Sequence, residues 1–432
     1  MNPKKVYLSL IIALVILTNV VAQNSIDFQI EAIAKVQLNS YANAWHPHLY
    51  ATERAFPGSD SYRNYLHQLK LLRFSSLSSM PESLSSTKKT TAADPIYASG
   101  FVANPFGGIP NDNDLAISND GLIVSVCNSD MYVYDEQANL LFDLALEDLA
   151  DSLGLVANSY DPKVLYDQDE DRFILVFLNG NNANSTDIVV CFSESNNPQG
   201  AWNVYSLPGN PLNNNAWSDF PMIAINKNDF FVTVNHINSD SASWQTGFMQ
   251  SVIWQVEKAT GYAGGVLNSK VHVDIKHNSR PIRNLLPIKG GMYLAQDEMY
   301  FLSNRNFDFS NDTFFVVSIS EALSANPNLS TTSSAVQANR NYGLPPDAKQ
   351  TTTTFLQTND ARPLSGFIEN GQIHFVGNTV DEAGSLAAIY HGKLNTLESS
   401  WSVDLQILSD PVMEFGYPNI SFTGQTIVVS KH

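Results

Sequence analysis

A short phrase recurs along this chain of 432 residues, at intervals of about 40–50 residues. Each copy holds a small or polar residue, then an acidic or aromatic residue, then proline or leucine, and two short runs of strand-forming residues follow. The copies are Asn113-Asp114-Leu115, Tyr160-Asp161-Pro162, Asp219-Phe220-Pro221, Asp360-Ala361-Arg362-Pro363 and Gly416-Tyr417-Pro418. Self-similar units of this size, built from short strands, are typical of β-propeller blades. The sequence therefore predicts an all-β propeller, a fold that by itself assigns no activity.

Six four-stranded blades account for residues 96–432. The repeat places five blades at 111–150, 158–208, 216–265, 280–330 and 358–408, and a sixth unit begins at Phe415 and ends after two strands. The blade at 280–330 is the least regular, so a ring of seven blades is the alternative. Two explanations of the short sixth unit stay open. Either the run Ile96–Val102 supplies an outer strand to it, or the chain is a fragment of a longer protein.

The first 22 residues predict a signal peptide. Lys4 and Lys5 precede an apolar run over Val6–Val21, and small residues stand before Gln23. We therefore expect an exported protein, either secreted or held at the cell surface. No later segment is long and apolar enough to span a bilayer, so no membrane insertion is expected after cleavage.

A helical lead-in is predicted for residues 23–80. Ile26, Ile30 and Ile33 fall at helical spacing, and a second set repeats that spacing between Tyr62 and Leu72. Residues 81–95 are rich in Ser and Thr and have no periodicity, which predicts a linker before the propeller.

The charge balance excludes some partners. The chain has 24 basic and 42 acidic residues and a net charge of −18. So acidic a protein lacks the cations that neutralise phosphates, and we expect it to bind neither nucleic acid nor an anionic membrane. Cys127 and Cys191 each lie within an apolar strand, so we interpret them as small buried apolar residues, with a disulfide as the alternative.

Residues 107–265 resemble a group of uncharacterised secreted bacterial β-propeller proteins that are loosely sialidase-like in fold. The similar stretches are GGIPNDNDLAIS, YDPKVLYDQDEDRFILVF, CFSESNNPQGAWNVYSL and WSDFPMIAINKNDFFVTVN. The resemblance implies a propeller exported by a bacterium, and it implies no reaction. Ser193–Trp202 also resembles the Asp box, a turn between the outer strands of sialidase blades, in which we expect Gly200 to form the turn and Trp202 to pack between blades.

The residues that precede each innermost strand are the main candidates for a site, because these strands begin at one rim of the central channel. They are Asp114, Asp161, Asp219, Arg283, Asp360, Arg362 and Tyr417. Crowded carboxyl groups raise one another's pKa values, and they also suit acid–base catalysis or a divalent cation. The structural alternative is that each Asp accepts backbone hydrogen bonds and fixes the entry into its strand.

A second candidate is a calcium site formed by Asp167, Asp169 and Asp171. Alternating aspartates supply the oxygen ligands that Ca²⁺ prefers. The same residues stand between two predicted strands, so the alternative is a solvated hairpin turn. No Ser-His-Asp set, phosphate-binding loop or zinc-binding cysteine pair is present.

Two functions remain open from the sequence. The leading hypothesis is a non-enzymatic module that binds an extracellular glycan or protein through the rim face. The alternative is a glycoside hydrolase or polysaccharide lyase, in which the rim acids act as acid and base and the arginines hold an acidic sugar.

Overall fold

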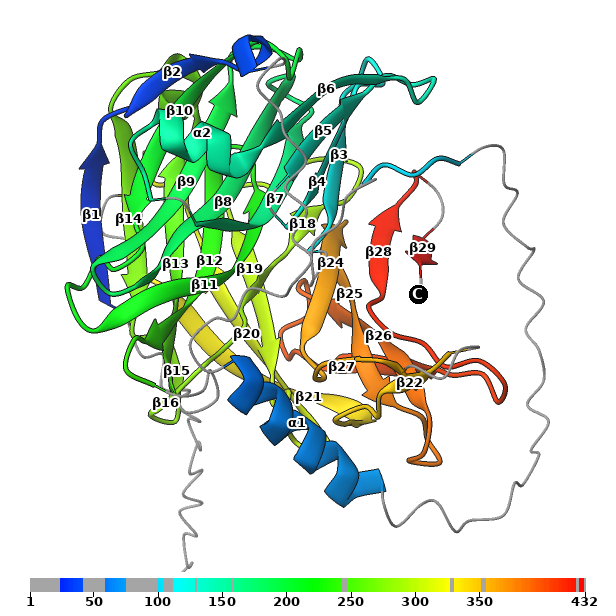
Figure 1. The fold of residues 1–432 in the computed structure, drawn as a ribbon. Helices are drawn as coiled ribbons and strands as arrows, with labels where there is room; N and C mark the ends of the chain where they lie inside the picture. The colour runs from blue at the N-terminus through cyan, green and yellow to red at the C-terminus, as the bar shows by residue number, and fades with distance from the viewer. Residues whose placement is uncertain are drawn as a thin grey trace, which may run out of the picture.

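The computed structural model describes residues 24–41, 59–74, 100–104, 112–128, 130–156, 158–241, 247–326, 330–350, 355–424 and 427–430. The predicted signal peptide (1–22) and linker (81–95) lie outside the described residues. The described chain is mostly β-strand, arranged as sheets that follow one another round the molecule in chain order (Figure 1). None of the described helices is both long and apolar enough to cross a membrane.

Five consecutive segments each form a four-stranded antiparallel meander. Sheet 1 contains β3 (Asp114–Ile117), β4 (Ile123–Cys127), β5 (Asp130–Tyr134) and β6 (Leu140–Ala145). Sheet 2 contains β7 (Ser159–Asp167), β8 (Arg172–Asn182), β9 (Ser185–Ser193) and β10 (Ala201–Pro208). Sheet 3 contains β11 (Ala216–Ile225), β12 (Asp229–Asn238), β13 (Phe248–Glu257) and β14 (Leu267–Val273). Sheet 4 contains β17 (Leu286–Pro287), β19 (Met299–Asn304), β20 (Asn311–Ile319) and β21 (Thr332–Tyr342). Sheet 5 contains β24 (Pro363–Glu369), β25 (Gln372–Val380), β26 (Ala387–Asn395) and β27 (Val403–Leu408).

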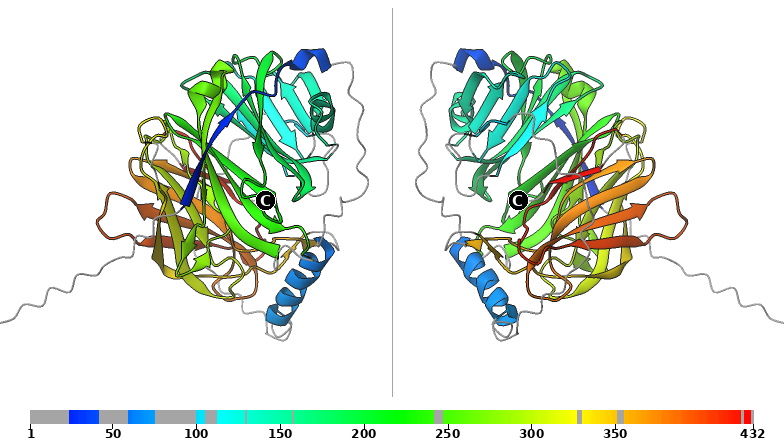
Figure 2. Two further views of the ribbon diagram at one scale, coloured as in Figure 1. Left: turned by 90° about the vertical axis from the view of Figure 1, so that its left-hand side faces the viewer. Right: turned by 90° about the vertical axis from the view of Figure 1, so that its right-hand side faces the viewer.

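The first strands of successive sheets lie next to one another. β3 contacts β7, β7 contacts β11, β11 contacts β17, and β17 contacts β24. Figure 2 shows, from two opposite sides, the sheets arranged around a common centre. Sheets 4 and 5 also join at their outer edge, where β21 and β27 run parallel and pair at Ala338 and Val403. This succession of meanders with their first strands innermost is the topology of propeller blades.

The strands are almost continuously apolar because sheets lie on both of their faces. In β8, Phe173 and Leu175 join an apolar cluster shared with sheet 1, whereas Ile174 and Val176 join a cluster shared with sheet 3. Cys191 belongs to the first of these clusters, and both it and Cys127 are buried and form no disulfide. The prediction that they serve as small apolar residues is confirmed, and burial raises the pKa of the Cys127 thiol to about 12.

The turn that resembles an Asp box joins β9 to β10. The Gly200 N–H donates to the Asn197 carbonyl and closes the turn. The indole N–H of the buried Trp202 donates to the Pro198 carbonyl at 2.9 Å, and its ring packs between sheets 1 and 2. The turn therefore has the structural role that the sequence predicted.

The helical prediction for Ile26–Ile33 is wrong. Residues Asn24–Ile30 form β1, which pairs with β14 at the outer edge of sheet 3, and Ala34–Gln37 form β2, which pairs with β10 at the edge of sheet 2. The 3-10 helix Leu38–Tyr41 follows. An unpaired outer strand leaves its backbone groups without partners, and pairing with β1 and β2 supplies those partners.

The helices lie outside the sheets. Helix α1 (Ser59–Phe74) rests against the loops of sheets 4 and 5, where the buried Lys70 ammonium donates to Asp347 Oδ1 at 2.5 Å and to Thr358 Oγ1 at 3.0 Å. Helix α2 (Leu146–Ser152) follows sheet 1, and α4 (Lys258–Ala263) lies between β13 and β14. Because α4 is inserted before the last strand of sheet 3, that strand ends beyond residue 265, where the sequence placed the end of the blade. The last strand of sheet 4 likewise ends beyond residue 330, the predicted end of its blade.

Short strands complete the described chain. The short pairs are β15 (Lys276–His277) with β16 (Arg280–Pro281) and β22 (Ala348–Lys349) with β23 (Phe355–Leu356), and β18 (Lys289–Gly290) runs parallel to β24. The sixth unit consists of β28 (Asn419–Phe422) paired with β29 (Ile427–Ser430), and β28 lies against β24. Residues 100–104 form no strand, and Phe101 packs against Tyr134 of sheet 1 at a ring separation of 5.0 Å. The rest of the run proposed to complete the sixth unit, 96–99, lies outside the described residues.

Candidate site at the rim of the inner strands

The recurring phrase forms a β-bulge near the start of the innermost strand in three sheets. The pairing register shifts at Asp161-Pro162 in β7, at Phe220-Pro221 in β11 and at Leu364 in β24. A bulge inserts an extra residue into one strand, and the side chain of that residue no longer follows the regular alternation between the two faces of the sheet. The bulges therefore place side chains of the phrase away from the sheet faces, which are filled with apolar residues.

The residue before proline has a left-handed backbone in three copies of the phrase. The φ angles are 51° for Asp161, 56° for Phe220 and 48° for Tyr417. A non-glycine residue in this region costs about 1–3 kcal/mol, and such residues concentrate at functional sites. All three residues stand near the start of an inner strand. The strained backbone therefore recurs at the same end of the inner strands in three separate units.

Asp161 and Asp112 form a carboxyl pair at that end. Asp112 stands two residues before β3, and its side chain shares a hydrogen bond with the side chain of Asp161. Burial raises the pKa of Asp161 far above its usual range, and the charges of Asp112 and Asp219 raise it further. Burial also raises the pKa of Asp112, against the opposing effect of Lys163. The shared hydrogen bond itself raises the pKa of Asp161 and lowers that of Asp112, so within the pair the proton favours Asp161.

Asp219 belongs to the same group of charges. Burial raises its pKa to about 7, although the Arg362 guanidinium and the Phe220 backbone N–H both favour the charged form. The charge of Asp112 raises the pKa of Asp219 as well, so the carboxyls contributed by sheets 1, 2 and 3 act on one another. Near neutral pH, Asp219 is divided between its protonated and ionised forms.

Arg362 is held by two contacts. Its guanidinium makes a two-pronged ion pair with Asp360, with Nε to Oδ1 at 2.8 Å and the terminal nitrogen to Oδ2 at 2.5 Å, and it lies 4.5 Å from the centre of the Phe220 ring. Asn306 donates to Asp360 Oδ2 at 2.8 Å. Burial alone would raise the pKa of Asp360, but Arg362 outweighs burial and holds that pKa below its usual value.

Tyr417 brings an aromatic ring from the start of the sixth unit. Its hydroxyl donates to the Gln357 carbonyl at 2.5 Å, and its backbone N–H donates to Asn378 Oδ1 at 2.8 Å. Burial of the hydroxyl raises its pKa to about 12, with Arg362 and Asp360 acting on it in opposite directions. The residue as a whole is 38% exposed.

We call these six residues the rim cluster: Asp112, Asp161, Asp219, Asp360, Arg362 and Tyr417. The cluster offers carboxyl groups with different pKa values and an aromatic ring. This combination suits recognition of hydroxyl groups, and the separated pKa values of its carboxyls also suit transfer of a proton.

Two other rim candidates are placed differently. Asp114 accepts hydrogen bonds from the backbone N–H groups of Leu115 at 3.0 Å and Val164 at 3.3 Å, so it links β3 to β7, as the structural alternative predicted. The guanidinium of Arg283 lies 4.1 Å from the ring centre of Phe248 and 5.3 Å from that of Phe307. The Arg283 guanidinium therefore packs against two aromatic rings.

The predicted calcium ligands do not gather round one point. The buried carboxylate of Asp167 accepts from Lys258 Nζ at 2.7 Å and from the Tyr262 hydroxyl at 2.9 Å, which ties sheet 2 to α4. Asp171 accepts from the Tyr166 hydroxyl, and Asp169 is exposed. Among the described residues, no group of three or more His, Cys, Asp or Glu is arranged to hold a metal ion. The turn is thus a structural hairpin with a buried ion pair.

Sequence reasoning missed Asp112. The prediction took Asp114 because it stands directly before the strand, whereas Asp112 lies just outside the recurring phrase. The signal was the pair Asp112-Asn113, since both residues tolerate a left-handed backbone, and φ of Asp112 is 42°.

No family model and no curated protein matches this chain. Solved structures similar to it include YjhT, with 9% identity over 74% of this chain and 97% of that one and a TM-score of 0.40. The subtype N10 neuraminidase-like protein of A/little yellow-shouldered bat/Guatemala has 11% identity over 74% of this chain and 91% of that one, with a TM-score of 0.40. An exo-β-1,3-galactanase from Clostridium thermocellum has 11% identity over 74% of this chain and 64% of that one, with a TM-score of 0.36. The similar structures thus include neuraminidase-like proteins and glycosidases, at identities and TM-scores too low to assign a function to this chain.

Proposed function

We propose that this protein is a six-bladed β-propeller that binds a neutral glycan at the rim cluster. The observation that carries the proposal is the convergence of charged and aromatic side chains from five different units, held by strained backbone and β-bulges. Asp112, Asp161, Asp219, Arg362 and Tyr417 each come from the start of a separate inner strand.

The chemistry of the cluster suits a sugar. Carboxyl groups that donate and accept hydrogen bonds match the hydroxyls of a glycan, and an aromatic ring offers a flat surface to its C–H face. The partly exposed Tyr417 provides such a ring beside the carboxyls. Few polar groups fixed in position beside an apolar surface are typical of small-molecule sites.

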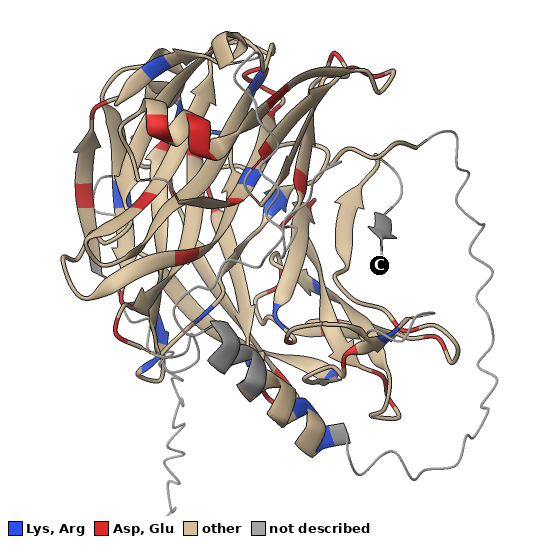
Figure 3. Ribbon diagram, viewed as in Figure 1, with Lys and Arg blue, Asp and Glu red and all other residues tan. Residues whose placement is uncertain are grey.

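The charges favour a neutral ligand over an acidic one. The Arg362 guanidinium is already paired with Asp360, and Arg283 packs against two aromatic rings. Figure 3 shows Lys and Arg scattered along the described ribbon among Asp and Glu. An anionic sugar at the rim would face three neighbouring carboxyls, and like charges at short range repel. The hypothesis that the two arginines hold an acidic sugar is therefore replaced by one in which the sugar is uncharged.

A glycan-binding screen tests this proposal. The purified protein would be presented with an array of neutral and acidic glycans, and the affinity of any hit would be measured by calorimetry for wild type and for Asp161→Asn and Tyr417→Ala. We expect a neutral hit whose affinity falls about tenfold in each variant, the size of one or two lost hydrogen bonds. Asp169→Asn, an exposed acid on a distant turn, is the control. A hit that is unaffected by both rim variants, or only a protein partner in a parallel pull-down, would contradict the proposal.

Glycoside hydrolysis is the second candidate. The observation in its favour is the separation of pKa values: burial raises the pKa of Asp219 to about 7 and raises the pKa of Asp161 well above its usual range. Acid–base catalysis needs one carboxyl that holds a proton and another that is ionised. Incubation of neutral polysaccharides with wild type and with Asp219→Asn, followed by chromatography of the products, decides between the candidates. Release of reducing sugars by wild type alone supports hydrolysis, and the absence of release by either protein supports binding without catalysis.

We also propose that the protein acts outside the cell, on the basis of the predicted signal peptide over residues 1–22. The test is expression of the full chain in a secreting bacterium. Export predicts a protein in the periplasm or medium that begins at Gln23, whereas an unprocessed protein that stays in the cytoplasm would contradict it.

A further inference from the structure

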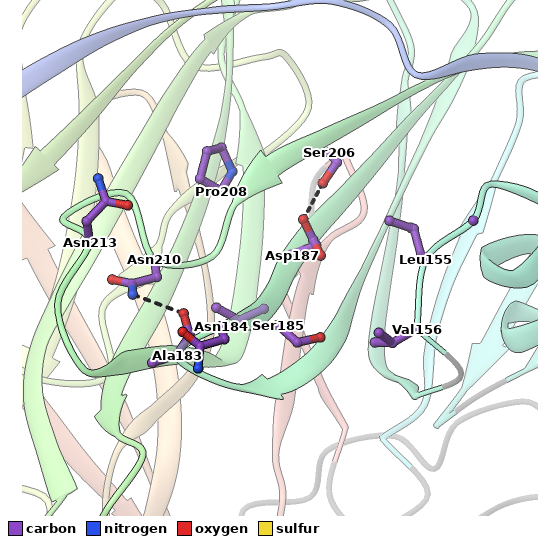
Figure 4. Close-up of a pocket in the computed structure, with 12 residues that line it drawn as sticks. Leu155, Val156, Ala183, Asn184, Ser185, Asp187, Ser206, Pro208, Asn210 and Asn213 are labelled. Atoms are coloured by element: carbon purple, nitrogen blue, oxygen red, sulfur yellow. Dashed lines mark hydrogen bonds between the residues drawn. The ribbon is translucent and has the colours of Figure 1, made fainter.

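A polar cavity of about 390 Å³ opens in sheet 2 (Figure 4). Leu155 and Val156 lie on one side of it, Asn210 and Asn213 lie on the other, and Asp187 with Ser206 lies between them. The cavity is not part of the rim cluster, and none of the residues predicted from the recurring phrase lines it.

The cavity lies at the same end of sheet 2 as Asp161. The strand pairings place Ser159, Asn179, Asp187 and Pro208 in one row across the four strands, and Asp161 stands two residues beyond Ser159. Three inter-strand steps of about 4.8 Å put the two ends of this row about 14 Å apart. A single sugar unit does not span that distance, whereas an oligosaccharide does.

Hydrogen bonds connect the wall of the cavity directly to the strand that carries Asp219. The Ser218 N–H donates to Thr186 Oγ1 at 3.1 Å, and the Ser218 hydroxyl donates to the Gly209 carbonyl at 2.7 Å. Thr186 lines the cavity, and Ser218 immediately precedes Asp219. These bonds hold the wall of the cavity to the strand that carries Asp219.

The lining has the two kinds of surface that a neutral sugar requires. Leu155 and Val156 provide apolar contact, while Asp187, Asn184 and Asn213 provide hydrogen-bonding groups. No Lys or Arg lines this cavity, so it holds no counter-charge for an acidic sugar. Asp187 is fixed by a hydrogen bond from the Ser206 hydroxyl at 2.7 Å, which leaves its second carboxylate oxygen for a ligand.

We infer that this cavity is a second subsite for the same glycan, so that the ligand is a neutral oligosaccharide that reaches from the rim cluster across sheet 2. The inference rests on the proposed function, since it extends the rim site outward. It also sets a minimum length for the ligand. An oligosaccharide that is too short to extend beyond the rim cluster gains no affinity from the cavity.

The test is the dependence of affinity on chain length. Neutral gluco-, galacto-, xylo- and arabino-oligosaccharides, from monosaccharide to hexasaccharide, would be titrated into wild type, Asp187→Ala and Asp161→Asn. In the series that binds, we expect Asp187→Ala to lower the affinity of the longest chains about tenfold and to leave the shortest binding ligands within twofold. Asp161→Asn should weaken every chain length. Asp187→Asn keeps an acceptor for Ser206 and should restore most of the affinity.

Two further comparisons keep the outcome decisive. The first is Asn184→Trp, which places a bulky ring at an exposed turn position and blocks the cavity. This variant tests the cavity independently of Asp187→Ala, and so replaces it if Asp187→Ala does not fold. Loss of the chain-length gain in Asn184→Trp supports the inference. If hexasaccharide affinity is unchanged in both cavity variants, the second subsite is overturned while the rim site stands. If no series binds wild type, or if Asp161→Asn weakens none of them, the proposed function itself fails.

Discussion

Asp161 and Asp112 share a side-chain hydrogen bond, although Asp161 belongs to sheet 2 and Asp112 precedes sheet 1. Two buried carboxyls in contact cannot both be ionised at low cost, so the pair retains a proton. The Asp219 carboxyl and the Arg362 guanidinium act on the same group of charges from sheets 3 and 5. Proton binding and folding stability are therefore coupled at the rim cluster.

The first prediction concerns Asp219 and pH. Its folded-state pKa is about 7 and its ordinary value is 3.8, so the folded protein holds this proton more tightly than the unfolded chain does. The stabilisation is complete below pH 3.8 and is lost as the pH rises through 7. We expect Asp219→Asn to be more stable than wild type at pH 8, and the difference to shrink toward pH 4. Thermal unfolding of both proteins across this range measures it, with Asp169→Asn as control. Parallel curves for wild type and Asp219→Asn would refute the assignment.

The second prediction concerns the buried ion pair between Arg362 and Asp360. Removal of one partner leaves the other charged and buried, which costs about 3–5 kcal/mol. We expect a loss of this size in the free energy of unfolding of Arg362→Ala, measured by urea denaturation. Arg362→Lys should also lose stability, because an ammonium cannot make the two-pronged contact. The double variant Arg362→Met/Asp360→Asn should lose less than Arg362→Ala. A loss below about 1 kcal/mol in Arg362→Ala would show that the pair is not buried in solution.

The third prediction concerns the histidines of sheet 5. His374 Nδ1 and His391 Nε2 are 3.1 Å apart, and His374 stacks on Phe367. Burial, together with the nearby His374 and Lys393, lowers the pKa of His391 to about 4. The folded protein therefore binds this proton less tightly than the unfolded chain, so stability is present above pH 6.5 and is lost as the pH falls toward 4. We expect His391→Asn to lose less stability than wild type between pH 6.5 and 4. Equal losses in thermal midpoint would contradict this.

The fourth prediction concerns β1. Phe28 lies 5.0 Å from the Trp254 ring and packs on the apolar cluster between sheets 2 and 3. Because the side chain is only partly buried, we expect Phe28→Ala to lower the free energy of unfolding by about 1–3 kcal/mol. Ile33→Ala, at an exposed position of the same segment, is the matched control and should have little effect. Equal effects of the two variants in urea denaturation would show that β1 does not pack on sheet 3.

Much of the fold follows from local sequence, because each sheet is made of strands that are neighbours along the chain. The first N-terminal segment was misassigned since Ile26, Ile30 and Ile33 also fit a helix. The alternation of Phe28, Ile30 and Ala32 indicated a strand, and the decisive factor was the free edge of β14, a partner more than 200 residues away in the sequence.

The site was predicted in part for the same reason. The phrase before each inner strand marked Asp161, Asp219 and Arg362, because every blade repeats one local geometry. Arg283 stands where the repeat is least regular, and the local pattern did not reveal its aromatic neighbours, which come from other segments. The partner of Asp167 is Lys258, on α4 between two strands of sheet 3, so a local pattern of aspartates did not reveal the ion pair.

The central claim is that the rim cluster binds a neutral glycan. The most direct measurement is a calorimetric titration of the best neutral oligosaccharide and of its uronic-acid counterpart into wild type, Asp161→Asn and Asp219→Asn at pH 7. We expect wild type to bind the neutral ligand at least tenfold more tightly than the acidic one, and we expect both variants to bind the neutral ligand more weakly than wild type does. Equal or tighter binding of the acidic ligand by wild type, or neutral-ligand affinity unchanged in both variants, would contradict it.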